Sequence, residues 1–358
     1  MIALYFVYIL FEALHQPFDM SVIEKKAALL VLPIAFTCSN FTQKKYRQIL
    51  SYFVYGTLIA CIICYFNAFF NSLSFIGGLH FDFQSTSSLK NNFLESSMYG
   101  GNHFFGDNFS IFHQSVYFAL FINISVIILL FTDIIKLRLI LKYTLLLFFG
   151  LIIFQISNRV NIVVFFLLLL FRLLTVNGLR VKLILFFSVL VFGSLILFNN
   201  PRTKVLIDKV INFELVTDRE AENSFGTRIL VWDASLNVIK NNLALGVGFS
   251  NAYNQLQKVY KEKRYVVPYR NRLNSHNQYL QIVIECGVLG LMCLLIIQYV
   301  LLPKVNNKHR LFSLYFLLII NINFLFESVL NRYSGLICFA FFYCCIIGLK
   351  KNELELDS

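Results

Sequence analysis

The sequence has 358 residues, of which 58% are hydrophobic and 14% are charged, whereas an ordinary soluble domain has about 45–50% and about 25%. This composition excludes an ordinary soluble enzyme, and the 40 phenylalanines and 18 tyrosines exclude a disordered chain. The formal net charge is +12. Most of this excess lies in short connections between apolar segments, as membrane insertion requires, so we expect no nucleic-acid partner.

Long apolar segments predict an all-α fold, a polytopic membrane bundle of about ten transmembrane helices, because about 20 apolar residues are needed to cross a bilayer. The segments are 1–14, 27–43, 51–75, 115–133, 139–157, 160–178, 181–199, 277–302, 311–329 and 333–349. The first has no basic N-terminal region and no small-x-small cleavage site, so we expect an uncleaved helix rather than a signal peptide.

Lysine and arginine fill alternate connections, which predicts two cytoplasmic termini and two long external loops, since positive loops stay in the cytoplasm. The expected parts are N-terminal transmembrane helices over 1–199 with an external loop over 76–114, a large external loop over 200–275, C-terminal transmembrane helices over 276–349, and a cytoplasmic tail over 350–358.

Neither a disulfide framework nor a metal site is predicted. All eight cysteines lie in or beside apolar stretches, and Cys61-x-x-Cys64 is interpreted as two small apolar side chains of one helix. No two of the histidines and aspartates in the 76–114 loop have the i,i+4 spacing of metal ligands, so we assign no metal.

The 200–275 loop is much longer than a connection requires, and such loops tend to carry function. Its twelve basic and seven acidic residues give it a net charge of +5, which suits an anionic ligand at the outer membrane surface.

Within this loop, residues 226–240 predict an amphipathic helix with Ser224 or Thr227 as its cap. The apolar residues at helical spacing are Ile229, Trp232, Leu236 and Ile239. Arg228 would lie in the first turn, where free N–H groups favour an anion and a guanidinium fork can hold phosphate. The alternative is an interfacial arginine that extends its charge to water. Gly246-Val-Gly248 then predicts a helix stop and a tight turn. No P-loop is present, which counts against an ATP-driven pump.

The segment Asn274-Ser-His-Asn-Gln-Tyr-Leu280 precedes an apolar run. Ser275 and Gln278 have capping-box spacing, so a membrane helix should begin there with His276 in its first turn. A helix N-terminus favours the neutral imidazole, which can act as a general base. The alternative is an interfacial histidine that only forms hydrogen bonds.

Two further charged positions lie near predicted external turns. Arg159 follows one apolar segment, and a charge at the bilayer centre costs several kcal/mol. We therefore expect its side chain to face the bundle or an anion, or to extend to the membrane interface. Near the last external turn, we expect Glu327 and Arg332 to pair or to line one cavity.

Taken in order, these motifs resemble the O-antigen polymerase and O-antigen ligase superfamily of bacterial membrane glycosyltransferases. The matching elements are Ser157-Asn-Arg159, Arg228-x-x-x-Trp232, Leu245-Gly-Val-Gly248, His276-Asn-x-x-Leu280, Glu285-x-Gly287-x-x-Gly290 and, as found in some members, His113-x-x-x-Tyr117.

The resemblance implies glycan transfer from a polyprenyl diphosphate donor to a sugar hydroxyl at the periplasmic face of the inner membrane, with no metal and no other cofactor. By position, Arg159 and Arg228 would bind the diphosphate and His276 would activate the acceptor. Supporting roles are expected for Trp232, Asn277, Arg270, Arg272 and Glu327. A base and two arginines would supply what a weak nucleophile and a diphosphate leaving group need.

Several activities share this chemistry. We favour a polymerase of surface polysaccharide repeat units, with a chain-length regulator protein as a further partner. A ligase that moves the polymer to a lipid A core and a protein O-oligosaccharyltransferase stay open. A flippase or transporter of lipid-linked glycans would be expected to show internal repeats, and we find none in the sequence.

Overall fold

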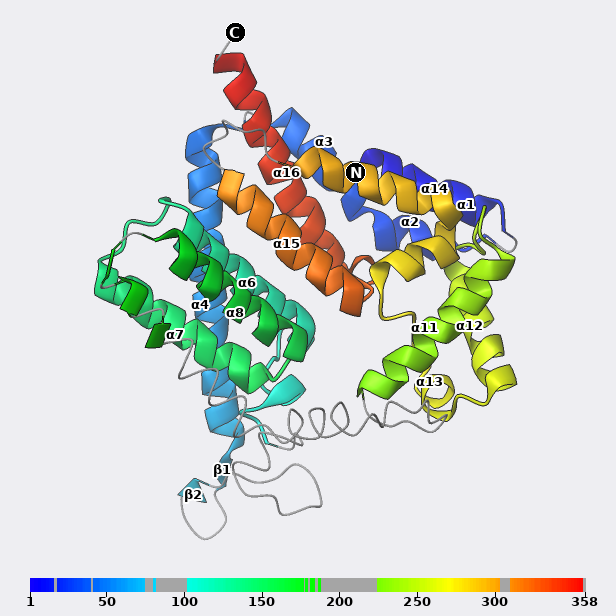
Figure 1. The fold of residues 1–358 in the computed structure, drawn as a ribbon, viewed down its shortest axis with the longest axis horizontal. Helices are drawn as coiled ribbons and strands as arrows, with labels where there is room; N and C mark the ends of the chain where they lie inside the picture. Colours follow the sequence, from blue (N-terminus) through cyan, green and yellow to red (C-terminus); the bar gives the residue numbers. More distant parts are fainter. Residues whose placement is uncertain are drawn as a thin grey trace. The chain divides into compact units, whose positions relative to one another are not determined.

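The computed structural model describes residues 1–15, 18–39, 41–74, 80–81, 102–176, 178–179, 181–183, 186–187, 224–302 and 310–356. Over these residues the chain is helical, and the fold is the predicted all-α polytopic membrane bundle (Figure 1). A short antiparallel ladder joins β1 (Leu73–Ser74) to β2 (His80–Phe81).

Helices occupy nine of the ten predicted spans in the described part of the chain. They are α1 (Ile2–Ala13), α3 (Ala28–Cys38), α4 (Gln43–Asn71), α6 (Ser115–Phe131), α7 (Leu139–Ile156), α8 (Arg159–Thr175), α14 (Gln278–Leu301), α15 (Arg310–Phe326) and α16 (Tyr333–Leu356). Of these, α4, α7 and α14 are long and apolar enough to cross a membrane, while α1, α3, α6, α15 and the 333–348 part of α16 are apolar but shorter. Most of the predicted span 181–199, most of the 76–114 loop and residues 200–223 lie outside the described residues.

The chain forms two compact units. One contains both ends of the sequence, Met1–Tyr46 and Leu215–Ser358, and we call it the two-ended unit. The other is Arg47–Glu214, and we call it the inserted unit.

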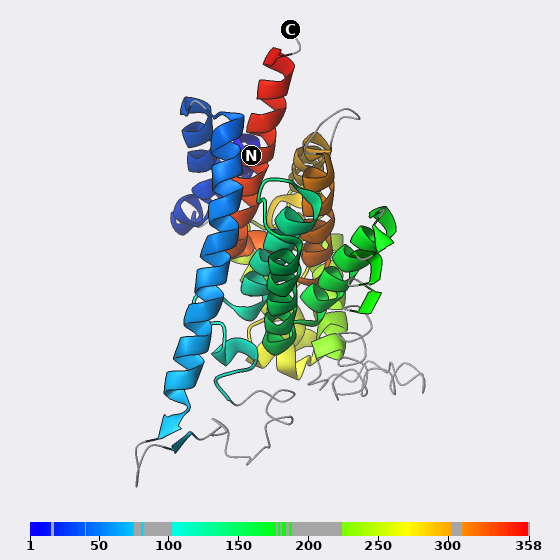
Figure 2. The same cartoon turned by 90° about the vertical axis from the view of Figure 1, so that its left-hand side faces the viewer.

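In the inserted unit, α6, α7 and α8 lie side by side (Figure 1), and α4 is one long helix (Figure 2). Fully buried Asn123 in α6 donates a hydrogen bond to the main-chain oxygen of Asn161 in α8 at 3.0 Å. Buried amides must be paired, so this bond fixes the start of α8 against α6.

In the two-ended unit, the N-terminal helices pack on the C-terminal ones. Helix α1 and the short α2 (Ser21–Lys26) precede α3, and α1 lies along α14 (Figure 1). Helix α3 packs on α16, where the rings of Phe36 and Phe341 meet edge to face at 5.7 Å. The two ends of the sequence therefore share one core.

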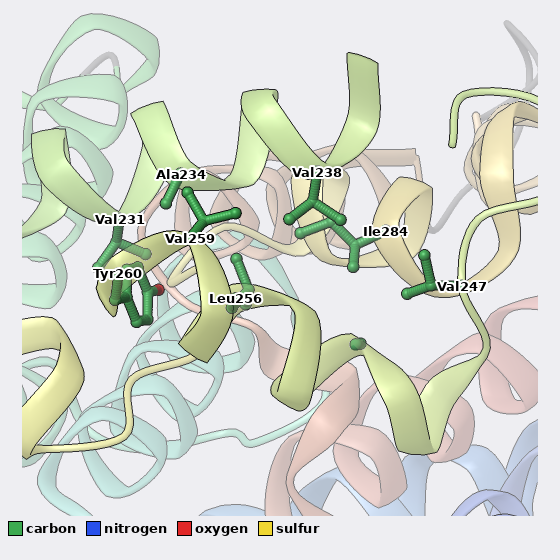
Figure 3. Close-up of a cluster of buried hydrophobic side chains, with 9 residues drawn as sticks. Val231, Ala234, Val238, Val247, Leu256, Val259, Tyr260 and Ile284 are labelled. Atoms are coloured by element: carbon green, nitrogen blue, oxygen red, sulfur yellow. The ribbon is translucent and has the colours of Figure 1, made fainter. Parts of the chain in front are cut away.

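Three helices lie between residue 223 and α14: α11 (Ser224–Asn241), α12 (Phe249–Lys263) and α13 (Val266–Arg270). Helices α11 and α12 bury a shared apolar cluster that also contacts α14 (Figure 3). Its members are Val231, Ala234, Val238, Val247, Ala252, Leu256, Val259, Tyr260 and Ile284. Of the predicted apolar stripe of α11, Ile239 packs against this cluster. Leu236 is 56% exposed, because the side that meets α12 and Ile284 carries Val231, Ala234 and Val238 instead.

Helix α14 is interrupted at Gly287, whose φ and ψ are 62° and −165°. The segment after α11 supplies the hydrogen bonds lost at this kink. Val247 N donates to Ile284 O at 2.8 Å, Gly248 N to Glu285 O at 3.1 Å, and Val288 N to Leu243 O at 3.0 Å. Gly246-Val-Gly248 is therefore more than the predicted tight turn, because it forms a backbone contact with a membrane helix.

Candidate active site

His276 lies in the turn before α14, and its Nδ1 is 3.3 Å from Oε2 of Glu327. Its backbone is left-handed, with a φ of 43°, and its N–H donates to Asn274 Oδ1 at 3.0 Å. A non-glycine residue in this conformation is uncommon and is found where surrounding structure holds it, often at functional sites. The turn therefore presents the imidazole to the carboxylate that follows α15.

Asn277, not Ser275, caps α14. Asn277 Oδ1 accepts hydrogen bonds from the N–H groups of Tyr279 and Leu280 at 2.9 and 3.1 Å. The predicted capping box was therefore wrong, and His276 precedes the helix instead of lying in its first turn. Gln278 is engaged elsewhere, since its Oε1 accepts the N–H of Leu330 at 2.7 Å. Gln281 takes the predicted role and accepts the Ser275 N–H at 3.1 Å.

Glu327 follows the last residue of α15, and its side chain is 16% exposed. Burial alone would raise the pKa of this carboxyl group. The hydrogen bond with His276 and the charges of His276 and Arg228 outweigh burial and hold the pKa below its usual value. Glu327 is therefore a carboxylate at neutral pH. It pairs with His276, whereas we expected it to pair with Arg332 or to line one cavity with it.

Arg228 is the fifth residue of α11, so it lies in the second turn and not in the predicted first turn. The side chain is half-buried. Burial lowers the pKa of its guanidinium group, and the charge of Glu327 opposes this shift. Arginine stays protonated at any pH of interest. Arg228 therefore brings a fixed positive charge within electrostatic reach of the His276–Glu327 pair.

Trp232 lies one turn after Arg228 on α11. Its ring meets that of Phe326 at 6.4 Å between centroids, with an angle of 39° between the planes. Its Nε1 is buried and has no hydrogen-bond partner among the residues that the structure describes. Since Phe326 precedes Glu327, the side of α11 with Arg228 and Trp232 faces the turn that carries the carboxylate.

The other predicted residues of this unit lie nearby in sequence. Asn277 is the helix cap, and its Nδ2 donates to Leu325 O at 3.1 Å, which joins the His276 turn to the end of α15. Arg270 ends α13 and Arg272 follows it, and both are exposed. Arg272 also has a left-handed backbone, with a φ of 51°.

Arg159 belongs to the inserted unit and is the first residue of α8. Asn158 caps this helix by accepting the Asn161 N–H at 3.0 Å, and Asn161 Nδ2 also donates to the same oxygen at 3.0 Å. A half-buried arginine thus begins a helix whose first turn is fixed by asparagines. Also in this unit, the ring of His113 packs on Phe121 at 5.0 Å, and burial lowers its pKa.

A second layer of polar residues, which the sequence did not predict, lies behind His276. Lys26 is fully buried beside the 327–332 turn. Gln281 and Asn331 also belong to this layer. A glutamate at position 285 within an apolar run was the available signal, since buried charges require partners.

The O-antigen ligase family model matches residues 143–295. The matched range contains Arg159, Arg228 and His276 and ends before Glu327. This match confirms the resemblance to the O-antigen polymerase and ligase superfamily, and it indicates a glycosyltransferase-like enzyme of the membrane that acts on lipid-linked glycans. No curated protein matches the chain.

Proposed function

We propose that this chain, with its O-antigen ligase match over residues 143–295, polymerises polyprenyl-diphosphate-linked repeat units of a surface polysaccharide. The observation that carries the proposal is the His276–Glu327 pair, 3.3 Å apart, within electrostatic reach of Arg228. These groups match the two needs of the reaction, a base for a sugar hydroxyl and a positive charge for a diphosphate.

In the proposed reaction, Nδ1–H of His276 donates to Glu327, which leaves Nε2 free to accept the proton of the acceptor hydroxyl. The hydroxyl oxygen attacks the anomeric carbon of the donor as the bond to the diphosphate oxygen breaks. The configuration inverts, the proton moves to His276, and the bond electrons leave with the diphosphate. Glu327 then stabilises the imidazolium, as a carboxylate does in a catalytic triad. Base catalysis of this kind contributes about 10²–10⁴-fold in rate.

Arg228 supports this chemistry by stabilising the leaving group. A guanidinium fork can bind two phosphate oxygens at once, and it acts most strongly where water is excluded. Arg159, in the inserted unit, is also proposed to bind diphosphate. The proposed mechanism uses no metal. Trp232, Asn277, Arg270 and Arg272 are proposed to support the substrates.

We further place the reaction at the periplasmic face of the bacterial inner membrane, with both termini in the cytoplasm. The acceptor is a glycan or a lipid-linked glycan, and a chain-length regulator is a proposed partner. The description of the matched family favours a second candidate, an O-antigen ligase that transfers the polymer to lipid A core.

The test is the envelope glycan profile of cells that lack this gene, complemented with wild type, His276→Ala or the matched control His103→Ala. A core with at most one repeat unit in the deletion strain and in His276→Ala supports a polymerase. Full-length polymer that stays on the polyprenyl carrier supports the ligase instead. Normal polymer in His276→Ala cells contradicts the role of His276 as the base. An unchanged glycan profile in the deletion strain would point to protein glycosylation or transport.

A further inference from the structure

The ammonium group of Lys26 is enclosed by the two-ended unit. The residue is 0% exposed, and its Nζ donates to Leu330 O at 2.8 Å and to Asn331 Oδ1 at 3.0 Å. It also lies 4.2 Å from the ring centre of Tyr8 and 4.7 Å from that of Phe249. Burial lowers the pKa of Lys26 to about 8, with Glu285 opposing the shift, so the amine is protonated at pH 7. Two acceptors and two aromatic faces thus hold one buried cation.

Asn331 links this cation to a buried acid. Its Nδ2 donates to Oε1 of Glu285 at 2.6 Å, and Glu285 is also 0% exposed. The same Oε1 accepts Gln281 Nε2 at 2.6 Å. Lys26 is therefore linked to a buried acidic side chain through two hydrogen bonds. Removing the partners of a buried cation is costly, because the charge loses its compensation.

The linked residues lie on both sides of the candidate active site. Leu330 and Asn331 form part of the short helix η2 (Val329–Asn331), directly after the turn that carries Glu327. Gln281 accepts the N–H of Ser275, the residue before His276. The hydroxyl groups of Ser275 and Ser328 are 3.2 Å apart. Lys26 and the hydrogen bonds around Glu285 thus support both segments from which the imidazole and the carboxylate project.

We propose that Lys26 is a positioning residue, which acts through Leu330 and Asn331 to keep the turn of Glu327 in register with His276. The inference rests on the proposed function, since it takes His276 as the base. Lys26 lies more than a hundred residues before the matched region 143–295, so the family match implies nothing about it.

The N-terminal segment is held in place for this role. Glu12, at the end of α1, accepts the Ser250 N–H at 3.2 Å and also bonds the Ser250 hydroxyl group. Phe249, the neighbour of Ser250, is one of the two rings against the Lys26 ammonium. The start of α12 therefore binds the N-terminal segment on both sides of the connection between α1 and α2.

The experiment is a double-mutant cycle in the full-length protein reconstituted with lipid-linked donor. Transfer is measured for Lys26→Met, Glu327→Gln and the combined variant, with Lys25→Met as the matched control, because Lys25 is exposed. We expect Lys26→Met to lower kcat about tenfold with little change in KM, and to have almost no further effect when Glu327 is already glutamine, because residues that act through one another are not additive.

An equal loss of kcat from Lys26→Met in both backgrounds would overturn the proposal, as would an unchanged kcat. If Lys26→Met does not accumulate as folded protein, Asn331→Ala takes its place, since this change breaks the hydrogen-bonded link and keeps both Lys26 and Glu285. Unchanged kcat in Asn331→Ala would then overturn the proposal. Failure of the proposed function gives a different result, in which Glu327→Gln and His276→Ala leave transfer intact.

Discussion

A Cβ atom on Gly246 would lie 2.7 Å from the backbone nitrogen of Gly287, and a Cβ on Gly287 would lie 2.1 Å from the carbonyl oxygen of Ala244. Both glycines have left-handed φ values, +65° and +62°. Side chains are therefore excluded on both sides of the contact between the segment after α11 and the kink of α14. The motifs at 245–248 and 285–290 form two halves of one backbone interface.

Gly287→Ala should destabilise the protein by at least about 2 kcal/mol, because the new methyl group meets main-chain atoms and the φ value is unfavourable. Thermal unfolding of the detergent-solubilised protein measures the loss. Gly56→Ala is the matched control, since Gly56 lies within α4 with nothing within 4 Å of the added atom. We expect that control to be neutral or up to about 1 kcal/mol more stable. Equal stability of the two variants would contradict the close approach.

Glu327→Gln should reduce stability in a way that depends on pH. The pKa of Glu327 is held below its usual value in the folded protein, so its contribution is complete above the unfolded pKa, about 4.3, and is lost as the pH falls through the folded pKa. A hydrogen bond to a charged group is worth about 1.5–3 kcal/mol. The difference in Tm between wild type and Glu327→Gln should therefore be largest near pH 7 and shrink below pH 4.

The control for that experiment is Glu262→Gln, because Glu262 is an exposed glutamate of α12. Its Tm should follow wild type at every pH. A wild-type to Glu327→Gln difference that stays constant between pH 7 and pH 3.5 would show that the carboxylate charge does not contribute.

Leu256→Ala should cost about 2–5 kcal/mol, because Leu256 is fully buried between α11 and α12 and its truncation leaves a cavity. Leu236→Ala, at the 56% exposed position of α11, should change stability by less than about 0.5 kcal/mol. Chemical denaturation of both variants compares the two faces of the helix. A larger loss of stability for Leu236→Ala than for Leu256→Ala would contradict this assignment and support the apolar face predicted from spacing alone.

Trp232 is the single tryptophan of the chain, so intrinsic tryptophan fluorescence reports on this position alone. Because Arg228 lies one turn away on α11, we expect a polyprenyl diphosphate to change the emission on binding. Arg228→Lys should weaken the measured affinity about tenfold, since a point charge replaces a fork. Arg264→Lys, at an exposed position, is the control. Identical titrations of Arg228→Lys and wild type would exclude Arg228 from diphosphate binding.

The apolar segments predicted the helices well, because the thickness of the hydrocarbon layer sets a length that a sequence shows directly. The details of the site needed the fold. Serine and asparagine are both favoured helix caps, so residue type alone does not distinguish Ser275 from Asn277. Asn277 is the cap in the structure, and Gln278, the expected partner of Ser275, binds Leu330 instead. Spacing placed Trp232 in the buried stripe of α11, but the position of α12 decides which side is covered.

Long-range pairs were the least predictable part of the site. Glu327 was expected near Arg332, yet it meets His276, 51 residues earlier in the chain. The side chain of Lys26 binds Leu330, which lies 304 residues later in the chain. Local patterns contain no information about such partners. Arg159 begins α8, in a different unit from His276.

The two-ended unit also has a consequence for the order of synthesis. Helices α1 and α2 leave the ribosome long before Glu285 and Asn331 are made, although these residues complete the surroundings of Lys26. The inserted unit, in contrast, is a continuous stretch that can fold as soon as it is complete. In a chain that stops before α14, Lys26 would therefore lack its buried partners. Quality-control proteases could distinguish such a chain from the finished protein.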